Sequence, residues 1–219
     1  MSITYLEAIR EAQARALAED PRVFIYGQDV GPFGGAFKAT KNLAHEFPGR
    51  VLDAPISEDA MVGAAVGAAI EGMRPIIEMQ FADFSTTGFN QIVNNAAALF
   101  WRTNVPCPIT IRLPCGGTSG GGPYHSQSME ALYAHYPGLV VMTPATVEVV
   151  RCGMGSDPRS RWIAVAPGFA CKRRFTASST NILDADPSPR TLLLSTRIFA
   201  ITVSLGLMNT KVAFPISIQ

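Results

Sequence analysis

The sequence lacks several features that mark common functional classes. It has no run of about 18 apolar residues, so no membrane span is expected. Its first 20 residues contain no apolar core of a secretory signal. The four cysteines form no C-x-x-C pair and no metal-ligand spacing, which is typical of reduced thiols. We therefore expect a cytoplasmic protein, or a mitochondrial matrix protein if it is eukaryotic. We expect it to have no metal site and to bind neither a membrane nor nucleic acid.

Glutamate is absent from residues 151–219. Residues 1–150 contain 9 Lys and Arg against 14 Asp and Glu, whereas residues 151–219 contain 9 against 3. Residues 151–190 also have no helical or strand period and are broken by prolines. This change of composition predicts a boundary near residue 150, with one domain at 1–150 and a divergent basic tail at 151–219. The sequence leaves open whether that tail is ordered.

Helical patterns alternate with short apolar strands in the first 150 residues. This alternation predicts an α/β fold, with a mainly parallel sheet and helices on both faces. In such a sheet, ligands bind beyond the carboxyl ends of the strands. The expected strands are 23–26, 51–53, 76–80, 108–113 and 139–142, and the expected helices include 5–19, one that starts near 58, and one from about 87 to 102.

The stretch Asp53–Gly72 combines a carboxylate with a helix of small residues. Glu58 stands where a short strand passes into this helix, and Gly63 and Gly67 lie inside it. Each helical glycine costs about 1 kcal/mol relative to alanine, so we expect a second backbone or a flat ligand to approach closely. Two interpretations of Glu58 remain open: a group for chemistry, or a residue that caps the helix with Ser57.

Two loops after strands contain candidate functional residues. Ser119 matches a G-x-S-x-G nucleophile elbow by its letters, but the glycines and proline after it cannot start the helix that the elbow needs. His125 lies in a polar loop and could donate to an oxyanion or relay a proton. Gln80, Phe81 and Phe84 end another strand and could hold a flat heteroaromatic ring, although the two aromatics could instead be ordinary core residues.

Four motifs together resemble one known family. They are GQDVGPFGGAF, RVLDAPISEDAMVGAAVGAAIEGMRPIIEMQFADF, FNQIVNNAA and YHSQSMEALYAHYPGLVVMTPATV, and they cover residues up to about 147. Their order and spacing are similar to those of the β subunit of the E1 component of 2-oxo acid dehydrogenase complexes. The resemblance implies a transketolase-like pyrimidine-binding domain for thiamine diphosphate.

The resemblance also implies roles for individual residues. Glu58 matches the glutamate that hydrogen-bonds the aminopyrimidine and activates the cofactor, and His125 matches the histidine that contacts substrate and assists lipoyl acylation. Phe84 matches the aromatic residue that packs on the pyrimidine, with Gln80 and Ile56 beside it. The implied partners are an E1 α subunit in a heterotetramer of two α and two β subunits, the lipoyl domain of the E2 acyltransferase, and a small 2-oxo acid.

Some features depart from the family pattern. The chain has no G-D-G motif with its following Asn, so the resemblance implies that the α subunit supplies the Mg²⁺ site. Gln28 and Asn90 stand where the family usually has carboxylates, which removes groups for proton communication between active sites. The resemblance ends near Glu148, and a truncated or frameshifted reading frame is one hypothesis for that end. The alternative function is a non-catalytic interaction module that keeps the fold and the α-subunit docking surface.

Overall fold

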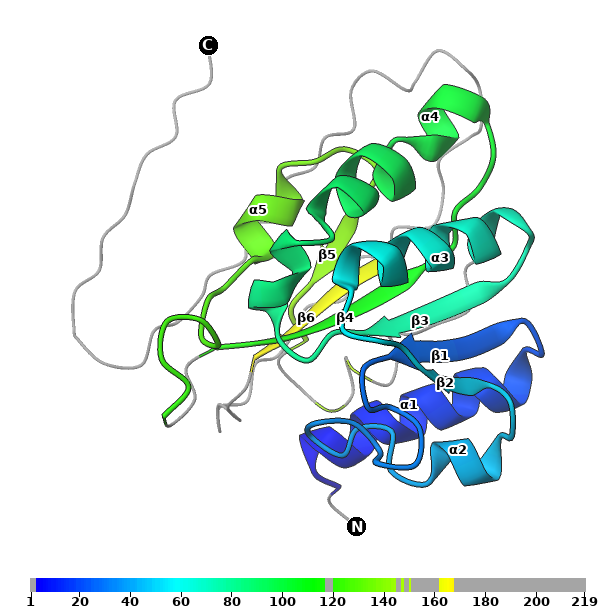
Figure 1. Cartoon of the computed structure of the whole chain (residues 1–219), viewed down its shortest axis with the longest axis vertical. Coiled ribbons are helices and arrows are strands. Elements are labelled where there is room, and N and C mark those ends of the chain that lie inside the picture. The colour runs from blue at the N-terminus through cyan, green and yellow to red at the C-terminus, as the bar shows by residue number, and fades with distance from the viewer. Residues whose placement is uncertain (1–2, 117–119, 145–146, 148–149, 151–161, 168–219) are drawn as a thin grey trace, which may run out of the picture. The chain divides into compact units, whose positions relative to one another are not determined.

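A six-stranded parallel sheet forms the centre of the fold in the computed structural model (Figure 1). The structure describes residues 3–116, 120–144, 147, 150 and 162–167, and for 162–167 only the backbone. The strand order is β2-β1-β3-β4-β6-β5, and every neighbouring pair is parallel. The strands are β1 (Val23–Gly27), β2 (Val51–Asp53), β3 (Arg74–Glu78), β4 (Thr110–Cys115), β5 (Val140–Met142) and β6 (Trp162–Pro167). The predicted α/β fold is confirmed.

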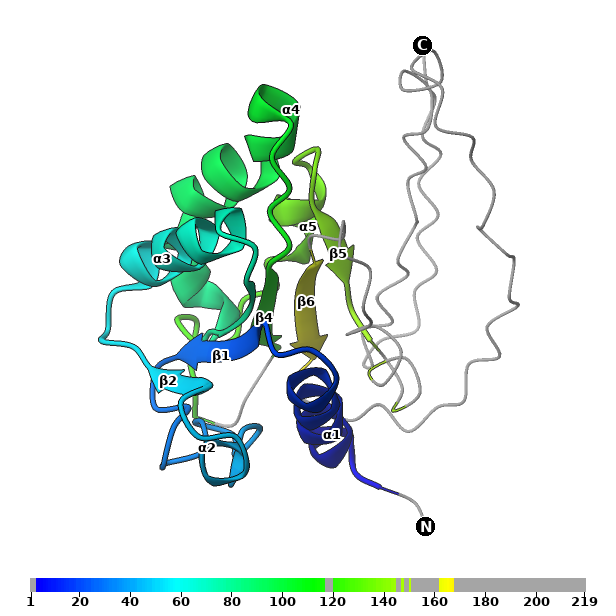
Figure 2. The ribbon, with the colours of Figure 1, turned by 90° about the vertical axis from the view of Figure 1, so that its right-hand side faces the viewer.

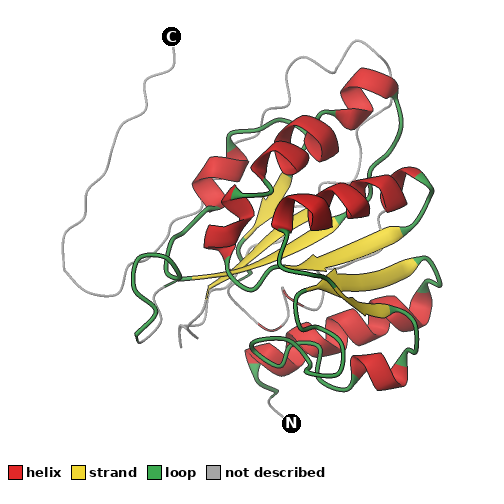
Figure 3. Ribbon diagram, in the orientation of Figure 1, coloured by secondary structure: helices red, strands yellow, loops and turns green. Residues whose placement is uncertain are grey.

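Helices cover both faces of this sheet, as predicted (Figures 2 and 3). Helices α1 (Tyr5–Glu19) and α2 (Leu43–Glu46) pack on one face through a core cluster that contains Leu17, Ile25 and Leu43. The other face carries α3 (Glu58–Ile70), the π-helix η2 (Gln91–Ala97), α4 (Leu99–Thr103) and α5 (Glu130–Ala134). A short 3-10 helix, η1 (Ala82–Thr86), joins β3 to this second layer.

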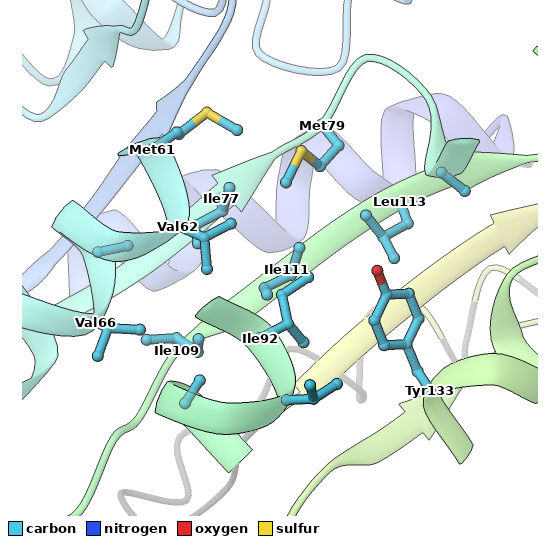
Figure 4. Close-up of a cluster of buried hydrophobic side chains, with 14 of the residues drawn as sticks. Met61, Val62, Val66, Ile77, Met79, Ile92, Ile109, Ile111, Leu113 and Tyr133 are labelled. Carbon is cyan, nitrogen blue, oxygen red and sulfur yellow. The ribbon is translucent and has the colours of Figure 1, made fainter. Parts of the chain in front are cut away.

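The cluster of apolar side chains beneath α3 is larger than the cluster that contains Leu17 and Ile25 on the other face of the sheet (Figure 4). Strand alternation explains it: Ile77 points toward α3, whereas its neighbour Ile76 belongs to the cluster on the α1 face. Ile111 and Leu113 of β4 extend the same apolar surface. Burying such side chains stabilises the fold by about 1.5–3 kcal/mol each.

Local sequence explains the first helix and strand. Thr4 accepts the backbone N–H of Glu7, and the Glu7 carboxylate accepts the N–H of Thr4, which closes a capping box at the start of α1. Gly27 ends β1 at a point where any side chain would collide. A Cβ there would lie 2.4 Å from the carbonyl oxygen of Glu78 on the neighbouring strand.

Two expectations from the sequence are wrong. The single helix expected over 87–102 is divided into η2, whose seven residues have π geometry, and the short α4. A π-helix changes the residues that share a face, so the exposed Trp101 and Phe100 lie outside the buried cluster. Residues 151–190 contain β6, which pairs with both β4 and β5. The rest of the predicted tail lies outside the described residues.

Candidate functional site

The candidate site lies at the carboxyl ends of β1, β2 and β3. The chain places β2 on one side of β1 and then β3 on the other, so the connections that leave β1 and β3 run in opposite directions. A topological switch point of this kind opens a crevice in which open α/β sheets bind ligands. Gln28 follows β1, Glu58 follows β2 and Gln80 follows β3, so the topology brings three of the polar strand ends to this crevice.

Glu58 is the first residue of α3, and its side chain is partly exposed. The Nε2 group of Gln28 donates a hydrogen bond to Glu58 Oε1 at 2.9 Å. The hydroxyl of Thr87 lies 3.3 Å from Glu58 Oε2 and 2.7 Å from the carbonyl oxygen of Phe84, so its one hydrogen is shared between two acceptors. Ser57 occupies the N-cap position but makes no side-chain capping bond. The Glu58 carboxylate is thus held by side chains from other elements.

Three rings form a cluster beside this carboxylate. His125 packs edge-on against Phe81 with ring centroids 4.6 Å apart, and against Phe84 at 5.4 Å. Phe81 and Phe84 are themselves in edge-to-face contact at 6.0 Å. All three side chains are partly exposed, so the two phenylalanines are not ordinary core residues. The structure therefore brings the predicted residues Phe84 and His125 together, although 41 positions separate them in the chain.

The other two predicted residues are arranged differently. Gln80 donates from Nε2 to Asp29 Oδ2 at 3.1 Å, so its side chain is tied to the β1 loop. Ile56 is 87% exposed. Asp29 has a φ of +56°, a left-handed conformation that Asp tolerates better than most residues. Consecutive residues of one turn, Gln28 and Asp29, thus hold Glu58 and Gln80.

Asp83 and Glu130 lie near the thiol of Cys115 on the inner side of the site. Burial, followed by the charges of Glu130 and Asp83, raises the pKa of the Cys115 thiol to about 12. Asp83 is only 7% exposed, and its Oδ1 accepts the backbone N–H of Gln127 at 3.2 Å. Asp83 Oδ2 and Glu130 Oε2 are buried without a hydrogen-bond partner. Cys115 is therefore an inert thiol, and Asp83 is a buried carboxyl group with one hydrogen-bond donor.

Sequence reasoning missed Asp29, Asp83 and Thr87. Asp29 follows directly after a strand end, and this position alone could have pointed to it. Asp83 stands between two aromatic residues that were singled out, but its contact with Gln127 spans 44 positions. No local pattern marks a contact over that separation.

The glycines of α3 have less contact than expected. A Cβ on Gly63 would meet the Gln91 side chain at 3.4 Å, which is ordinary packing, and one on Gly67 would meet nothing within 4 Å. The close approach occurs instead at Gly88, where a Cβ would lie 3.2 Å from the carbonyl oxygen of Glu58. Within this chain, Gly88 is the glycine that lets the segment before η2 pack on the start of α3.

Some expectations cannot be placed in this geometry. Ser119 lies outside the described residues. Within the described part of the chain, no group of three or more His, Cys, Asp or Glu side chains is arranged to hold a metal ion. None of the helices described there has the length and apolar character needed to cross a lipid bilayer.

Similarity to known proteins shows the family of this chain. The model of the transketolase pyrimidine-binding domain matches residues 1–152. The 2-oxoisovalerate dehydrogenase subunit beta of Bacillus subtilis (strain 168) is 48% identical over 147 residues, which are 66% of this chain and 45% of that protein. The pyruvate dehydrogenase E1 component subunit beta of Rickettsia conorii is 42% identical over 151 residues, 68% of this chain and 46% of that protein.

A solved structure supports the fold. The "Split gene transketolase, inactive beta4 tetramer" superposes with a TM-score of 0.64 at 20% identity, covering 80% of this chain and 55% of that one. The chain spans somewhat less than half the length of the two sequence relatives described above. The match over residues 1–152 nevertheless covers well over half of this chain. The chain therefore belongs to the transketolase pyrimidine-binding domain family, within which it is similar to the E1 β subunits of 2-oxo acid dehydrogenases.

Proposed function

We propose that this chain acts as the β subunit of a thiamine diphosphate-dependent 2-oxo acid dehydrogenase E1 component. Family membership supports the pyrimidine-binding role, and the relatives are named for pyruvate and 2-oxoisovalerate. One observation carries the proposal. The partly exposed Glu58 carboxylate stands at the switch point of the sheet, held by Gln28 and Thr87.

The donors and acceptors at this edge suit an aminopyrimidine. A carboxylate such as Glu58 can accept a hydrogen from a protonated ring nitrogen, and the amide of Gln80 can pair with polar substituents. The Phe84 ring supplies an apolar surface for a flat heterocycle. Ile56, 87% exposed, supplies an apolar side chain that is free to pack on a ligand. These residues would hold the pyrimidine half of the cofactor.

Thiamine diphosphate, when bound, supplies the electron sink that decarboxylation of a 2-oxo acid requires. The chain's own part is to hold and move protons. Glu58 keeps its proton-accepting oxygens in place because two side chains fix the carboxylate. His125 has its Nδ1 3.0 Å from the carbonyl oxygen of Gly121, so Nδ1 carries the hydrogen and Nε2 is left for a substrate. We propose that His125 contacts the 2-oxo acid and the lipoyl group of the E2 partner.

An E1 α subunit is the proposed partner at this edge. The loops that follow β1, β2 and β4 expose the apolar side chains of Phe33, Ile56 and Tyr124, which are 59%, 87% and 75% exposed. Large apolar side chains gathered around a polar site favour coverage by another protein. In this proposal the α subunit also supplies the Mg²⁺ and diphosphate contacts, because no metal-binding group is present among the described residues.

The test is an activity assay with a matched pair of variants. The chain is coexpressed with an α subunit, and decarboxylation of pyruvate and branched-chain 2-oxo acids is followed with an artificial electron acceptor. We expect Glu58→Gln to lower kcat by about 100-fold or more, because loss of a general acid–base group typically costs 10²–10⁴. Asp59→Asn is the control, since it removes the adjacent, exposed carboxylate of the same helix turn.

Two results would contradict the proposal or favour the alternative. If Glu58→Gln keeps the activity of the wild-type complex, Glu58 does not activate the cofactor. A stable complex with the α subunit that binds thiamine diphosphate but turns over none of the substrates would favour the non-catalytic interaction module.

A further inference from the structure

Among the described residues, the loop that carries His125 is joined to the rest of the site by a single hydrogen bond. Residues 120–128 form hydrogen bonds mainly among themselves: His125 with Gly121 and Gly122, and the Gln127 side chain with Pro123. Among the described residues, the bond from the Gln127 N–H to Asp83 Oδ1 is the one that ties this loop to another element.

Asp83 is well placed to serve as that anchor. It lies in η1 between Phe81 and Phe84, the two rings that contact His125. Both the anchor and the aromatic contacts therefore come from one short turn. Since Asp83 is 7% exposed and its Oδ2 has no hydrogen-bond partner, its polar carboxyl group is buried at a cost that one N–H only partly offsets. A side chain needed only for packing would not have to carry that polar group.

A second contact on η1 provides a structural comparison. Tyr133 of α5 donates its hydroxyl hydrogen to Ser85 Oγ at 2.6 Å, and its oxygen lies 3.2 Å from the Ser85 carbonyl oxygen. This bond holds the helix after the loop to the same turn but does not touch residues 120–128. Ser85 and Asp83 thus anchor two consecutive segments to η1, and only Asp83 acts on the His125 loop.

We propose that Asp83 is a positioning residue for His125. Its carboxyl group holds the backbone at Gln127, so that the imidazole stays in edge contact with Phe81 and Phe84, with Nδ1 on the Gly121 carbonyl and Nε2 available to a ligand. The catalytic consequence rests on the proposed function of His125, but the positioning itself is a property of this chain alone.

The positioning is tested by NMR on the full 219-residue chain. Hydrogen exchange of the Gln127 amide and the tautomer pattern of the His125 ring nitrogens are measured in the wild type, Asp83→Ala, Asp83→Asn and Ser85→Ala. We expect Asp83→Ala to speed Gln127 exchange by roughly ten- to a hundredfold, as for a lost bond to a charged group. It should also replace the Nδ1-protonated pattern by an average of both tautomers. Asp83→Asn keeps an acceptor oxygen, so both the exchange rate of the Gln127 amide and the His125 tautomer pattern should match the wild type.

The control separates positioning from general weakening. Ser85→Ala should lower the stability of the chain but leave the His125 tautomer pattern unchanged. Equal changes in Ser85→Ala and Asp83→Ala, or an unchanged His125 in Asp83→Ala, would overturn the proposal. If Asp83→Ala does not fold, Asp83→Leu fills the buried volume without an acceptor and gives the same comparison.

Activity in the complex with an α subunit tests the consequence separately. Asp83→Leu should lower kcat about tenfold or more, with an unchanged dissociation constant for thiamine diphosphate, because the cofactor contacts proposed here lie outside the loop. Unchanged kcat alongside a displaced His125 would contradict the catalytic consequence. An inactive wild-type complex would contradict the proposed function, and the NMR result would still decide the positioning.

Discussion

Both faces of the sheet have an apolar cluster, and the face under α1 also buries an ion pair. The face under α3 is packed by apolar side chains of β3 and β4, such as Ile77 and Ile111. On the face under α1, the neighbouring positions Glu78 and Arg112 form a buried bidentate ion pair between the same two strands. Burial lowers the pKa of the Arg112 guanidinium to about 10, which still leaves it charged near neutrality. Adjacent residues of one strand thus support two kinds of core.

This difference predicts which substitutions destabilise each face. Apolar packing loses free energy in proportion to the atoms removed, so a smaller side chain gives a graded loss. A buried ion pair is instead all or none, because removal of one partner leaves an uncompensated charge. We expect both faces to be sensitive to the volume of apolar side chains, and the α1 face to be sensitive also to charge at Glu78 and Arg112.

The largest effect is expected from breaking the ion pair. Arg112→Met should lower the free energy of unfolding by about 3–5 kcal/mol, because Glu78 would remain buried without its partner. The measurement is urea unfolding followed by circular dichroism at neutral pH.

The double variant Glu78→Leu with Arg112→Met is the control for that experiment. Removing both charges should restore most of the lost stability, since apolar side chains of similar volume often replace a buried pair without cost. A double variant as unstable as Arg112→Met would mean that the two faces do not differ in the way described.

A somewhat smaller effect is expected from the apolar face. Ile111→Ala should destabilise the chain by about 2–5 kcal/mol and Ile111→Val by about 0.5–1.5 kcal/mol, because the lost transfer energy and the cavity both grow with the atoms removed. Unfolding of both variants under the same conditions gives the comparison. Equal losses from Val and Ala would argue against volume as the determinant.

The smallest effect concerns high pH. Burial raises the pKa of Tyr133 to about 12, against about 10 for an exposed tyrosine. Between these values the unfolded chain loses the phenolic proton while the folded chain keeps it, so stability falls as pH rises. The full loss is up to about 2–3 kcal/mol for this group. Urea unfolding at pH 9, 10, 11 and 12 measures it.

Two phenylalanine variants isolate that contribution. Tyr133→Phe should flatten the decline of stability above pH 10, whereas Tyr124→Phe should leave it unchanged because Tyr124 is 75% exposed. A decline of the same steepness in Tyr133→Phe and the wild type would assign the pH dependence to other groups.

Much of the fold could be predicted because its causes are local. The capping box at Thr4 and Glu7 and the apolar positions Ile9 and Leu17 act within a few turns, and the predicted helix 5–19 has the same bounds as α1. The alternation of short strands with helices was enough to predict the parallel sheet. The π geometry of η2 could not be predicted, because its apolar pattern is also that of an ordinary helix.

The candidate site also has a part that local sequence predicts and a part that depends on contacts between distant residues. The position of Glu58, between a strand and a helix, could be read from residues next to each other. The partners that hold it, Gln28 and Thr87, come from other connections, 30 and 29 positions away. The edge-on contacts of His125 with Phe81 and Phe84 likewise depend on which loops meet at the carboxyl edge of the sheet.

The sequence by itself determined the α/β class, the positions of most elements, the family and the five residues Ile56, Glu58, Gln80, Phe84 and His125 as candidates. Only the tertiary structure decided that β6 pairs between β4 and β5, that Glu78 meets Arg112, and that Asp83 anchors the His125 loop. The physical reason is range. Capping and periodicity act between near neighbours, whereas strand order, register and burial are set by contacts between residues far apart in the chain.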